Sequence, residues 1–179
     1  WSAALNGHLY FQPTTETEIV TSGGWNAGSS IFYNDLGEGF VNANEYWAQA
    51  RVNHKGWFAQ TYFIQNDGGN DDDPVYLNRT GLIVPLERTH FEAQIQYNFE
   101  LPFLNSEWTT GIDFRNATAN TEHHVYGRNE GDDDYRILGG YLQGKFKLHN
   151  KLDLFLAGRL DSYNFTDEKT FSPRAAMVY

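Results

Sequence analysis

The sequence predicts an all-β fold: an antiparallel, up-and-down sheet of about nine membrane-spanning strands that form part of a larger transmembrane β-barrel. Three observations support this prediction. Apolar and polar residues alternate with a period of two in most segments, tight and long connections alternate between those segments, and no segment shows a convincing helical period.

The composition narrows the class of protein before any motif is considered. The chain has 179 residues, of which 40% are hydrophobic and 16% aromatic, enough for a folded domain. Its formal net charge of -10 comes without a local basic patch, so we expect no nucleic-acid partner. The lack of cysteine excludes disulfides and thiolate metal sites. Mean hydropathy is -0.58, and no apolar run approaches the roughly 18 residues of a transmembrane helix.

Period-two alternation is clearest between residues 91 and 98. Phe91 and Ile95 fall on one face there, while Gln94 and Gln96 fall on the other. The same pattern of one apolar and one polar face predicts strands at 5–12, 46–53, 91–98, 107–115, 138–148 and 152–161. Three more strands are expected at 18–25, at 171–179 and at the aromatic-rich segment 57–66, where the alternation is blurred. These lengths are close to the ~9 to 11 residues that a tilted strand needs to cross a bilayer.

The connections between these strands alternate in length. The tight ones span residues 13–17, 54–56 and 149–151, and the connection at 99–106 in the same series is only modestly longer. The long, polar ones span residues 26–44, 67–89, 116–134 and 162–170, and we expect loops without secondary structure there. Alternate connections of an up-and-down sheet lie at the same end, so all tight turns are expected on one rim and all long loops on the other. Outer-membrane barrels have this asymmetry.

The ends of the chain suggest a partial domain. The chain begins at Trp1 without a secretory leader, and its first strand is expected to start at the long-loop rim. Bacterial barrels normally have an even number of strands and both ends at the short-turn rim, so we expect at least one further strand before Trp1. An open sheet has unpaired edges that lipid does not tolerate, and more barrel is therefore needed to close it.

Several short phrases resemble a known family. Gly158-Arg159-Leu160-Asp161 is followed by a second strand at 171–179 that contains Ser172-Pro173-Arg174-Ala175, and further phrases lie at 32–37, 56–60 and 110–115. In this order they resemble the barrel domain of TonB-dependent outer-membrane receptors, particularly the large receptors typical of Bacteroidota.

The resemblance implies an energised importer in the outer membrane of a Gram-negative bacterium, with a plug inside a barrel of about 22 strands. Residues 1–179 then form a partial barrel domain, and no plug is recognisable in this chain. The implied partners are outer-membrane lipid, a small-molecule or glycan cargo such as a metal chelate, TonB through a segment outside this chain, and a surface lipoprotein.

The polar face of the predicted strands supplies the candidate ligand path. These residues either guide a polar ligand between barrel and plug, or form the hydrogen-bonded inner wall that any polar lumen needs. The sequence marks none of them above its neighbours, so both interpretations stay open. The residues are Gln49, Arg51, Gln94, Gln96, Asp113, Arg115, Gln143, Arg159 and Asp161.

Two acidic runs in the long connections are candidate Ca²⁺ ligands, because Ca²⁺ takes several carboxylate and carbonyl oxygens. The alternative is that they are solvated loop tips. The runs contain Asp67, Asp71, Asp72 and Asp73 in one connection, and Glu130, Asp132, Asp133 and Asp134 in the other. His123 and His124 are neighbours in an extended chain and point apart, so no metal site is expected there, and no other cofactor is expected.

No enzymatic activity is expected, because Glu92, Asp113 and Asp161 are carboxylates without a recognisable pocket. One alternative is a soluble lipocalin-like ligand-binding barrel with its apolar residues inside. Another is an outer-membrane barrel acting as a passive pore or an adhesin. Aromatic residues at strand ends suit the girdles at the lipid–water interface, namely Trp47, Trp57, Tyr97, Phe99 and Trp108.

Overall fold

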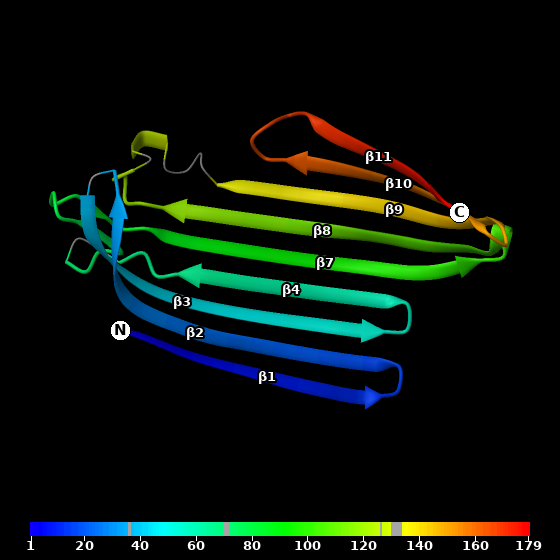
Figure 1. The fold of residues 1–179 in the computed structure, drawn as a ribbon, viewed down its shortest axis with the longest axis horizontal. Helices are drawn as coiled ribbons and strands as arrows, with labels where there is room; N and C mark the ends of the chain where they lie inside the picture. The colour runs from blue at the N-terminus through cyan, green and yellow to red at the C-terminus, as the bar shows by residue number, and fades with distance from the viewer. Residues whose placement is uncertain (36, 70–71, 126, 130–133) are drawn as a thin grey trace.

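The chain forms one antiparallel sheet of eleven strands (Figure 1). The computed structural model describes residues 1–35, 37–69, 72–125, 127–129 and 134–179. Nine long strands follow one another from edge to edge in chain order: β1 (Ser2–Thr14), β2 (Thr17–Asn34), β3 (Gly37–His54), β4 (Trp57–Asn66), β7 (Glu87–Leu101), β8 (Ser106–Asn120), β9 (Tyr135–His149), β10 (Leu152–Tyr163) and β11 (Lys169–Val178). Two short strands, β5 (Tyr76–Asn78) and β6 (Ile83–Val84), lie off this path, and β5 pairs with β3.

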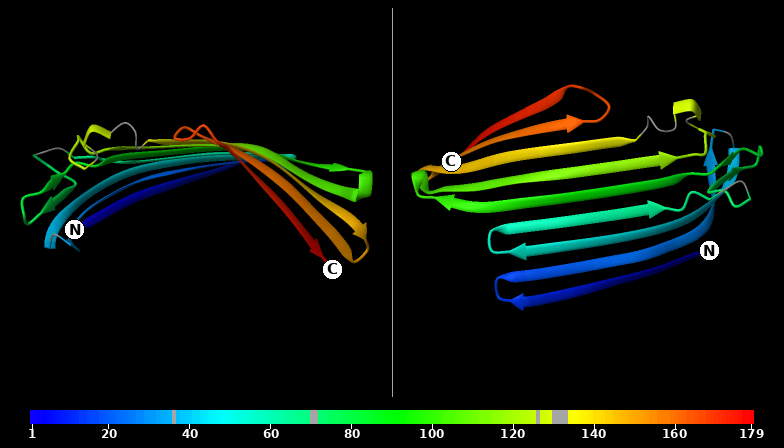
Figure 2. Two further views of the ribbon diagram at one scale, coloured as in Figure 1. Left: turned by 90° about the horizontal axis from the view of Figure 1, so that it is seen from above. Right: turned by 180° about the vertical axis from the view of Figure 1, so that it is seen from behind.

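The sheet is a single curved layer (Figure 2). It is open, since β1 pairs with β2 alone and β11 with β10 alone among the described strands. Val75 is the one buried hydrophobic side chain in the described part of the chain, so the sheet has no apolar core. Within the same ranges, no helix is long and apolar enough to cross a membrane.

The register confirms the two faces predicted from the alternation. Side chains of directly paired residues share a face of an antiparallel sheet. Gln94 pairs with Asp113, whereas Ile95 pairs with Ile112. We call the side of Gln94 and Asp113 the polar face and the side of Ile95 and Ile112 the apolar face. The same separation continues through all nine long strands.

The tight turns all lie at one end of the sheet, as predicted. They connect β1 to β2, β3 to β4, β7 to β8 and β9 to β10, and are on the right in Figure 1. The β7–β8 turn contains the short 3₁₀ helix η1 (Phe103–Asn105), in which Leu104 has a φ of 52°. The longer connections lie at the opposite end, which we call the loop end. One of them contains η2 (Gly127–Asn129).

The expectation of unstructured loops was wrong in two places. Residues 26–44 continue the β2–β3 hairpin, since β2 reaches Asn34 and β3 starts at Gly37. Residues 67–89 contain β5 and β6. The extensions of β2 and β3 are polar and rich in glycine, and neither of their faces is consistently apolar. The sequence therefore has no regular alternation there from which a strand could be predicted.

Candidate ligand path on the polar face

The nine residues predicted to line a ligand path all lie on the polar face. Their strands bring five of them close to one row across the sheet. Arg51 pairs with Gln60, Gln60 with Gln94, and Gln94 with Asp113. Asp113 and Asp161 both pair with Gly139, from opposite sides. Arg159 connects the two aspartates at the end of this row, Asp113 and Asp161.

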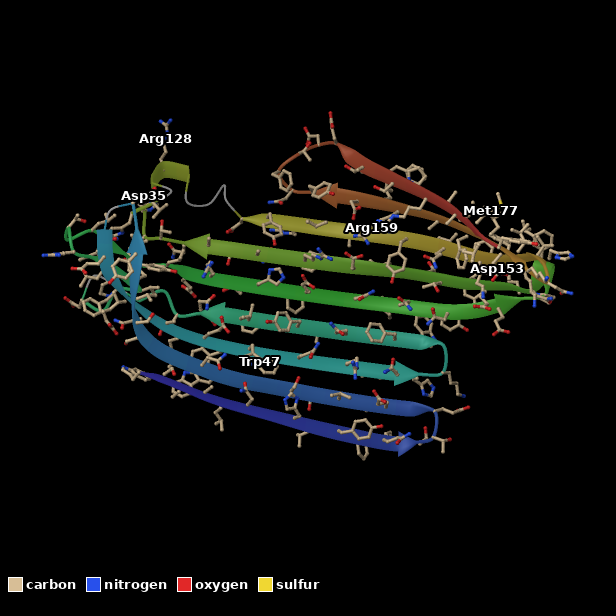
Figure 3. All side chains as sticks on the ribbon, viewed as in Figure 1. Asp35, Trp47, Arg128, Asp153, Arg159 and Met177 are labelled. Carbon is tan, nitrogen blue, oxygen red and sulfur yellow. The ribbon has the colours of Figure 1, made fainter. Side chains whose placement is uncertain are left out.

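Arg159 of β10 binds two carboxylates at once. Its Nη1 and Nη2 donate to Asp113 Oδ2 and Oδ1 at 2.6 and 2.9 Å, a bidentate pair across β9. Its Nε and Nη2 also donate to Asp161 Oδ2 and Oδ1 at 2.9 and 2.6 Å. Asp113 and Asp161 are 9% and 7% exposed, so both carboxylates are buried and depend on this guanidinium for compensation. Figure 3 shows Arg159 near the middle of its strand.

A glycine makes this arrangement possible. Gly139 of β9 lies between Asp113 and Asp161 in the register, and the guanidinium of Arg159 occupies the space above it. A Cβ atom at this position would overlap Arg159 Nη2 and lie 2.6 Å from Asp161 Oδ1. The absence of a side chain on β9 therefore permits the link between β8 and β10.

Tyr141 makes a second cross-strand cluster beside the first. Its ring covers Gly111, where a Cβ atom would lie 2.6 Å from Tyr141 Cζ. Its hydroxyl donates to Gln96 Oε1 at 2.9 Å and accepts from Gln94 Nε2 at 3.0 Å. Tyr141 thereby holds Gln94 and Gln96, two of the predicted residues, in place. A cavity of about 160 Å³ opens between the two clusters, lined by Gln60, Glu92, Gln94, Asp113, Arg115, Tyr141 and Arg159 among others.

The remaining predicted residues join smaller groups. Arg115 Nε lies 3.6 Å from Glu92 Oε1, which also contacts His90 Nε2 at 2.9 Å. Arg51 Nη2 donates to Glu18 Oε1 at 3.5 Å. Arg51 Nε is buried without a partner in the described structure.

Gln49 and Gln143 complete the set. Ser22 Oγ donates to Gln49 Oε1 at 3.5 Å. Gln143 is exposed between Thr109 and Ala157.

The apolar face is exposed and carries no charge in its central zone. Ile95, Ile112 and Leu142 are 45%, 55% and 46% exposed. None of the described residues on this face is Asp, Glu, Lys or Arg within 5–11, 19–25, 46–52, 57–65, 91–99, 108–114, 138–146, 154–160 and 171–177.

Aromatic rings cross this face near the tight turns. Ring centroids are 4.5 Å apart for Trp57–Tyr97, 5.7 Å for Tyr97–Phe99, 6.3 Å for Phe99–Trp108 and 5.3 Å for Trp108–Phe146. The chain of rings spans β4, β7, β8 and β9. These rings lie at one end of the apolar face, where an aromatic girdle at the lipid–water interface is expected.

Trp47 was wrongly included in that girdle. It pairs with Gly24 and Ile64 on the polar face, and its indole covers Gly24 as Tyr141 covers Gly111. Aromatic residue type alone does not identify the face, whereas the even or odd position along the strand does.

A solved outer-membrane structure matches the chain over its full length. No protein-family model and no curated protein sequence matches it. The structure of the alcaligin outer-membrane receptor FauA from Bordetella pertussis matches 99% of this chain with a TM-score of 0.62 at 17% identity. This chain has the fold of an outer-membrane receptor barrel wall. It spans 32% of the FauA chain. The FpvAI–pyocin S2 complex aligns with 99% of this chain and 32% of that one, with a TM-score of 0.49 at 12% identity.

That match confirms, at the level of the fold, the prediction of an outer-membrane receptor barrel wall. It also accounts for the open sheet, because a receptor barrel wall continues on both sides of a segment of this length. The nine strands on the main path agree with the predicted number, and β5 and β6 are additions at the loop end.

The Ca²⁺ hypothesis stays a prediction. Asp71, Asp132, Asp133 and Glu130 lie outside the described residues. Of the others, Asp73 Oδ1 accepts from Asn42 Nδ2 at 3.4 Å and Asp134 Oδ1 accepts from the Ala119 amide at 3.3 Å. In the described ranges, no three His or acidic residues, including Asp67 and Asp72, converge as a metal site.

His123 and His124 bond to different backbone carbonyls. The Nδ1 atom of His123 contacts the Gly127 oxygen at 2.5 Å, and that of His124 contacts the Thr121 oxygen at 3.1 Å. Each ring is thus engaged in local loop structure, and the pair does not present two nitrogens to a common point.

Three structural contributors on the polar face were not predicted as site residues. Gly139 and Gly111 supply space, and Tyr141 supplies the hydroxyl that holds two glutamines. A glycine within a strong period-two pattern marks a close approach of this kind. Which side chain fills the space depends on the register with the neighbouring strand, which the sequence pattern does not determine.

Proposed function

We propose that this chain is part of the wall of a TonB-dependent outer-membrane barrel that takes up a scarce nutrient. The observation that carries the membrane assignment is the uncharged, exposed apolar face that runs across all nine long strands. A strand such as β4, with 10 residues, is about 33 Å long, and a tilt of about 40° brings its height close to the ~25 Å apolar band of such barrels.

The polar face is proposed to line the lumen. Its buried charges are compensated within the wall, as Arg159 is by Asp113 and Asp161. The side chains left to meet a ligand are then mainly amides such as Gln60 and Gln143, which suit a polar cargo. FauA is an alcaligin receptor, and together with this wall it supports a small-molecule cargo, either a metal chelate or a glycan.

The proposed partners follow from this role. TonB and the plug would act through segments outside this chain, outer-membrane lipid would cover the apolar face, and a surface lipoprotein is a further proposed partner. We propose no enzymatic activity, because Asp113 and Asp161 are both engaged in binding Arg159.

The rival soluble barrel requires the opposite orientation. In a lipocalin-like barrel Ile95, Ile112 and Leu142 would pack in a closed interior, but each of them is about half exposed on an open sheet here. Gln94 and Arg115 would have to face solvent on the outside of that barrel.

Single cysteines test the orientation, because this chain has none of its own. In the full-length protein in bilayers, with any native cysteines elsewhere replaced, Gln143→Cys is expected to react with a water-soluble maleimide and Leu142→Cys is expected to resist it. The two positions are neighbours on β9 and differ in the face they occupy. Equal labelling, or the reverse order, would contradict the proposal.

Energy coupling is tested by uptake. Cells that express the full-length protein are supplied with labelled ferric chelates and labelled oligosaccharides, with and without TonB. Uptake of one of these that requires both the protein and TonB is the expected result. Uptake without TonB would indicate a passive pore, and surface binding without uptake would indicate an adhesin.

A further inference from the structure

The apolar face changes character at the loop end of β2 and β3. Trp25 and Tyr46 are paired there, and the next pairs on the same face are Ala27 with Asn44 and Ser29 with Asn42. Successive pairs on one face are about 7 Å apart along a strand. If Trp25 and Tyr46 lie at the lipid–water interface, these polar pairs lie at the height of the lipid headgroups.

A cavity of about 390 Å³ opens at this height. The residues that line it include Trp1 and Trp25 and the polar residues Asn42, Asn44, Asp67 and Asp73. The volume falls within the range of about 300 to 1,000 Å³ that is usual for small-molecule sites.

Main-chain hydrogen bonds hold Asp67 and Val75, which both line the cavity, along β3. The Asp67 amide donates to the Asn44 carbonyl at 2.7 Å, and the Asn42 amide donates to the Val75 carbonyl at 2.8 Å. The cavity is therefore part of the paired sheet and its backbone frame.

The polar side chains of the cavity orient one another. Trp25 Nε1 donates to Asn44 Oδ1 at 2.5 Å, and Asn44 Nδ2 donates to Asp67 Oδ2 at 3.2 Å. Ser29 Oγ donates to Asn42 Oδ1 at 2.6 Å, and Asn42 Nδ2 donates to Asp73 Oδ1 at 3.4 Å. Amide and carboxylate groups are thus held beside the indole ring of Trp25.

This combination favours a sugar without phosphate. Ring hydroxyls of a sugar donate to carboxylate and amide oxygens, and its apolar ring face packs on an indole. A phosphate would instead face two carboxylates, and the described residues that line the cavity include no Lys or Arg to compensate it.

We infer that this cavity binds the uncharged saccharide headgroup of a glycolipid in the outer leaflet. The inference rests on the proposed membrane orientation. The cavity lies on the apolar face, away from Gln94 and Arg159, so a sugar bound there is not on the proposed path through the lumen. Its position beside the acyl region supports a lipid headgroup over a free sugar.

Lipid retention tests the inference. The full-length protein is equilibrated with phosphatidylcholine vesicles that contain digalactosyl diacylglycerol, extracted in detergent, and analysed by native mass spectrometry for retained lipid. Asn42→Ala removes the residue that bonds both Ser29 and Asp73, and is expected to reduce retained glycolipid about fivefold, the effect of one lost hydrogen bond of about 1 kcal/mol. Asp67→Ala is a second, independent variant with the same expected direction.

Asn26→Ala is the matched control. Asn26 is on the same hairpin at a similar height, but it pairs with Glu45 on the polar face, so its removal is expected to leave glycolipid retention unchanged. Mobility before and after heating on a gel verifies that each variant is folded.

Three results would overturn the inference. The first is equal retention by wild type and both cavity variants, and the second is full competition by free digalactose, which would indicate a soluble sugar. The third is stronger retention of a phosphorylated glycolipid. The cysteine-labelling experiment separates these failures from failure of the proposed function, because reversed labelling of Leu142→Cys and Gln143→Cys would contradict the membrane orientation itself.

Discussion

At the residue scale, the polar face depends on a few side chains that bridge strands. Arg159 serves two buried carboxylates, and Gly139 leaves the room for it. A buried carboxylate that loses its partner becomes an uncompensated charge, which costs more than the intact pair contributes. Stability should therefore respond more to removal of Arg159 than to removal of an exposed charge.

Replacement of Arg159 tests this directly. Arg159→Gln is expected to lower the free energy of unfolding by about 3 kcal/mol, measured by urea unfolding of the full-length protein refolded in lipid vesicles. Arg115→Gln is the control, since its 3.6 Å contact with Glu92 is about half exposed and should cost less than about 1 kcal/mol. Equal losses would show that the two carboxylates do not depend on Arg159.

Two adjacent glycines allow a second test. Gly139→Ala is expected to displace the guanidinium of Arg159 and to cost about 1–3 kcal/mol in the same unfolding experiment. Gly140→Ala places its Cβ on the apolar face, where the nearest atom is 4.0 Å away, so it should be neutral or slightly stabilising. If both variants behave alike, the space above Gly139 is not what positions Arg159.

At the element scale, the tight turns align the strands. In the β3–β4 turn Lys55 has a φ of 53°, and the carbonyl of Gly56 accepts from the Asn98 amide at 2.8 Å. β7 therefore packs directly on the turn that precedes β4. A Cβ atom on Gly56 would overlap the Asn98 carbonyl oxygen.

Gly56→Ala is expected to separate β7 from this turn. Faster hydrogen exchange of the Asn98 amide, with a loss of about 1–3 kcal/mol in unfolding free energy, would report the change. The comparison is Gly7→Ala in β1, where no atom lies within 4 Å of the added Cβ. Unchanged exchange at Asn98 would mean that the turn adapts without moving β7.

At the scale of the whole molecule, the sheet is one layer with two different faces. Its described residues form no apolar core, and their apolar side chains are exposed on one face. Lipid on that face would bury them, and further barrel strands would pair the edges at β1 and β11. Stability is then a property of the barrel in its bilayer.

A charge on each face tests that view. Leu142→Arg places a guanidinium on the apolar face and is expected to cost about 2–4 kcal/mol in lipid vesicles. Gln143→Arg, one residue further on β9 and on the polar face, is expected to change stability by less than about 1 kcal/mol. Equal tolerance of both would argue against lipid contact at Leu142.

Much of the architecture was predictable because it is repetitive. Period-two alternation in 91–98 and 107–115 identified the strands, their faces and their neighbours, and the alternating connection lengths identified the two ends. The extended β2–β3 hairpin was missed because neither face of residues 26–44 is consistently apolar, so the alternation is lost there. Trp47 was misplaced because its type suggested an interface, while its odd position on β3, like those of Gln49 and Arg51, assigned it to the polar face.

By itself the sequence determined the strand order, the two faces and the nine candidate residues, since alternation along a strand is a local property of the backbone. Only the tertiary structure decided which of those residues meet. Arg159 reaches Asp113 across 46 positions, and Tyr141 reaches Gln94 across 47. Contacts of this kind depend on the register between strands and on the space that Gly139 and Gly111 leave, and both are set by the pairing of the whole sheet.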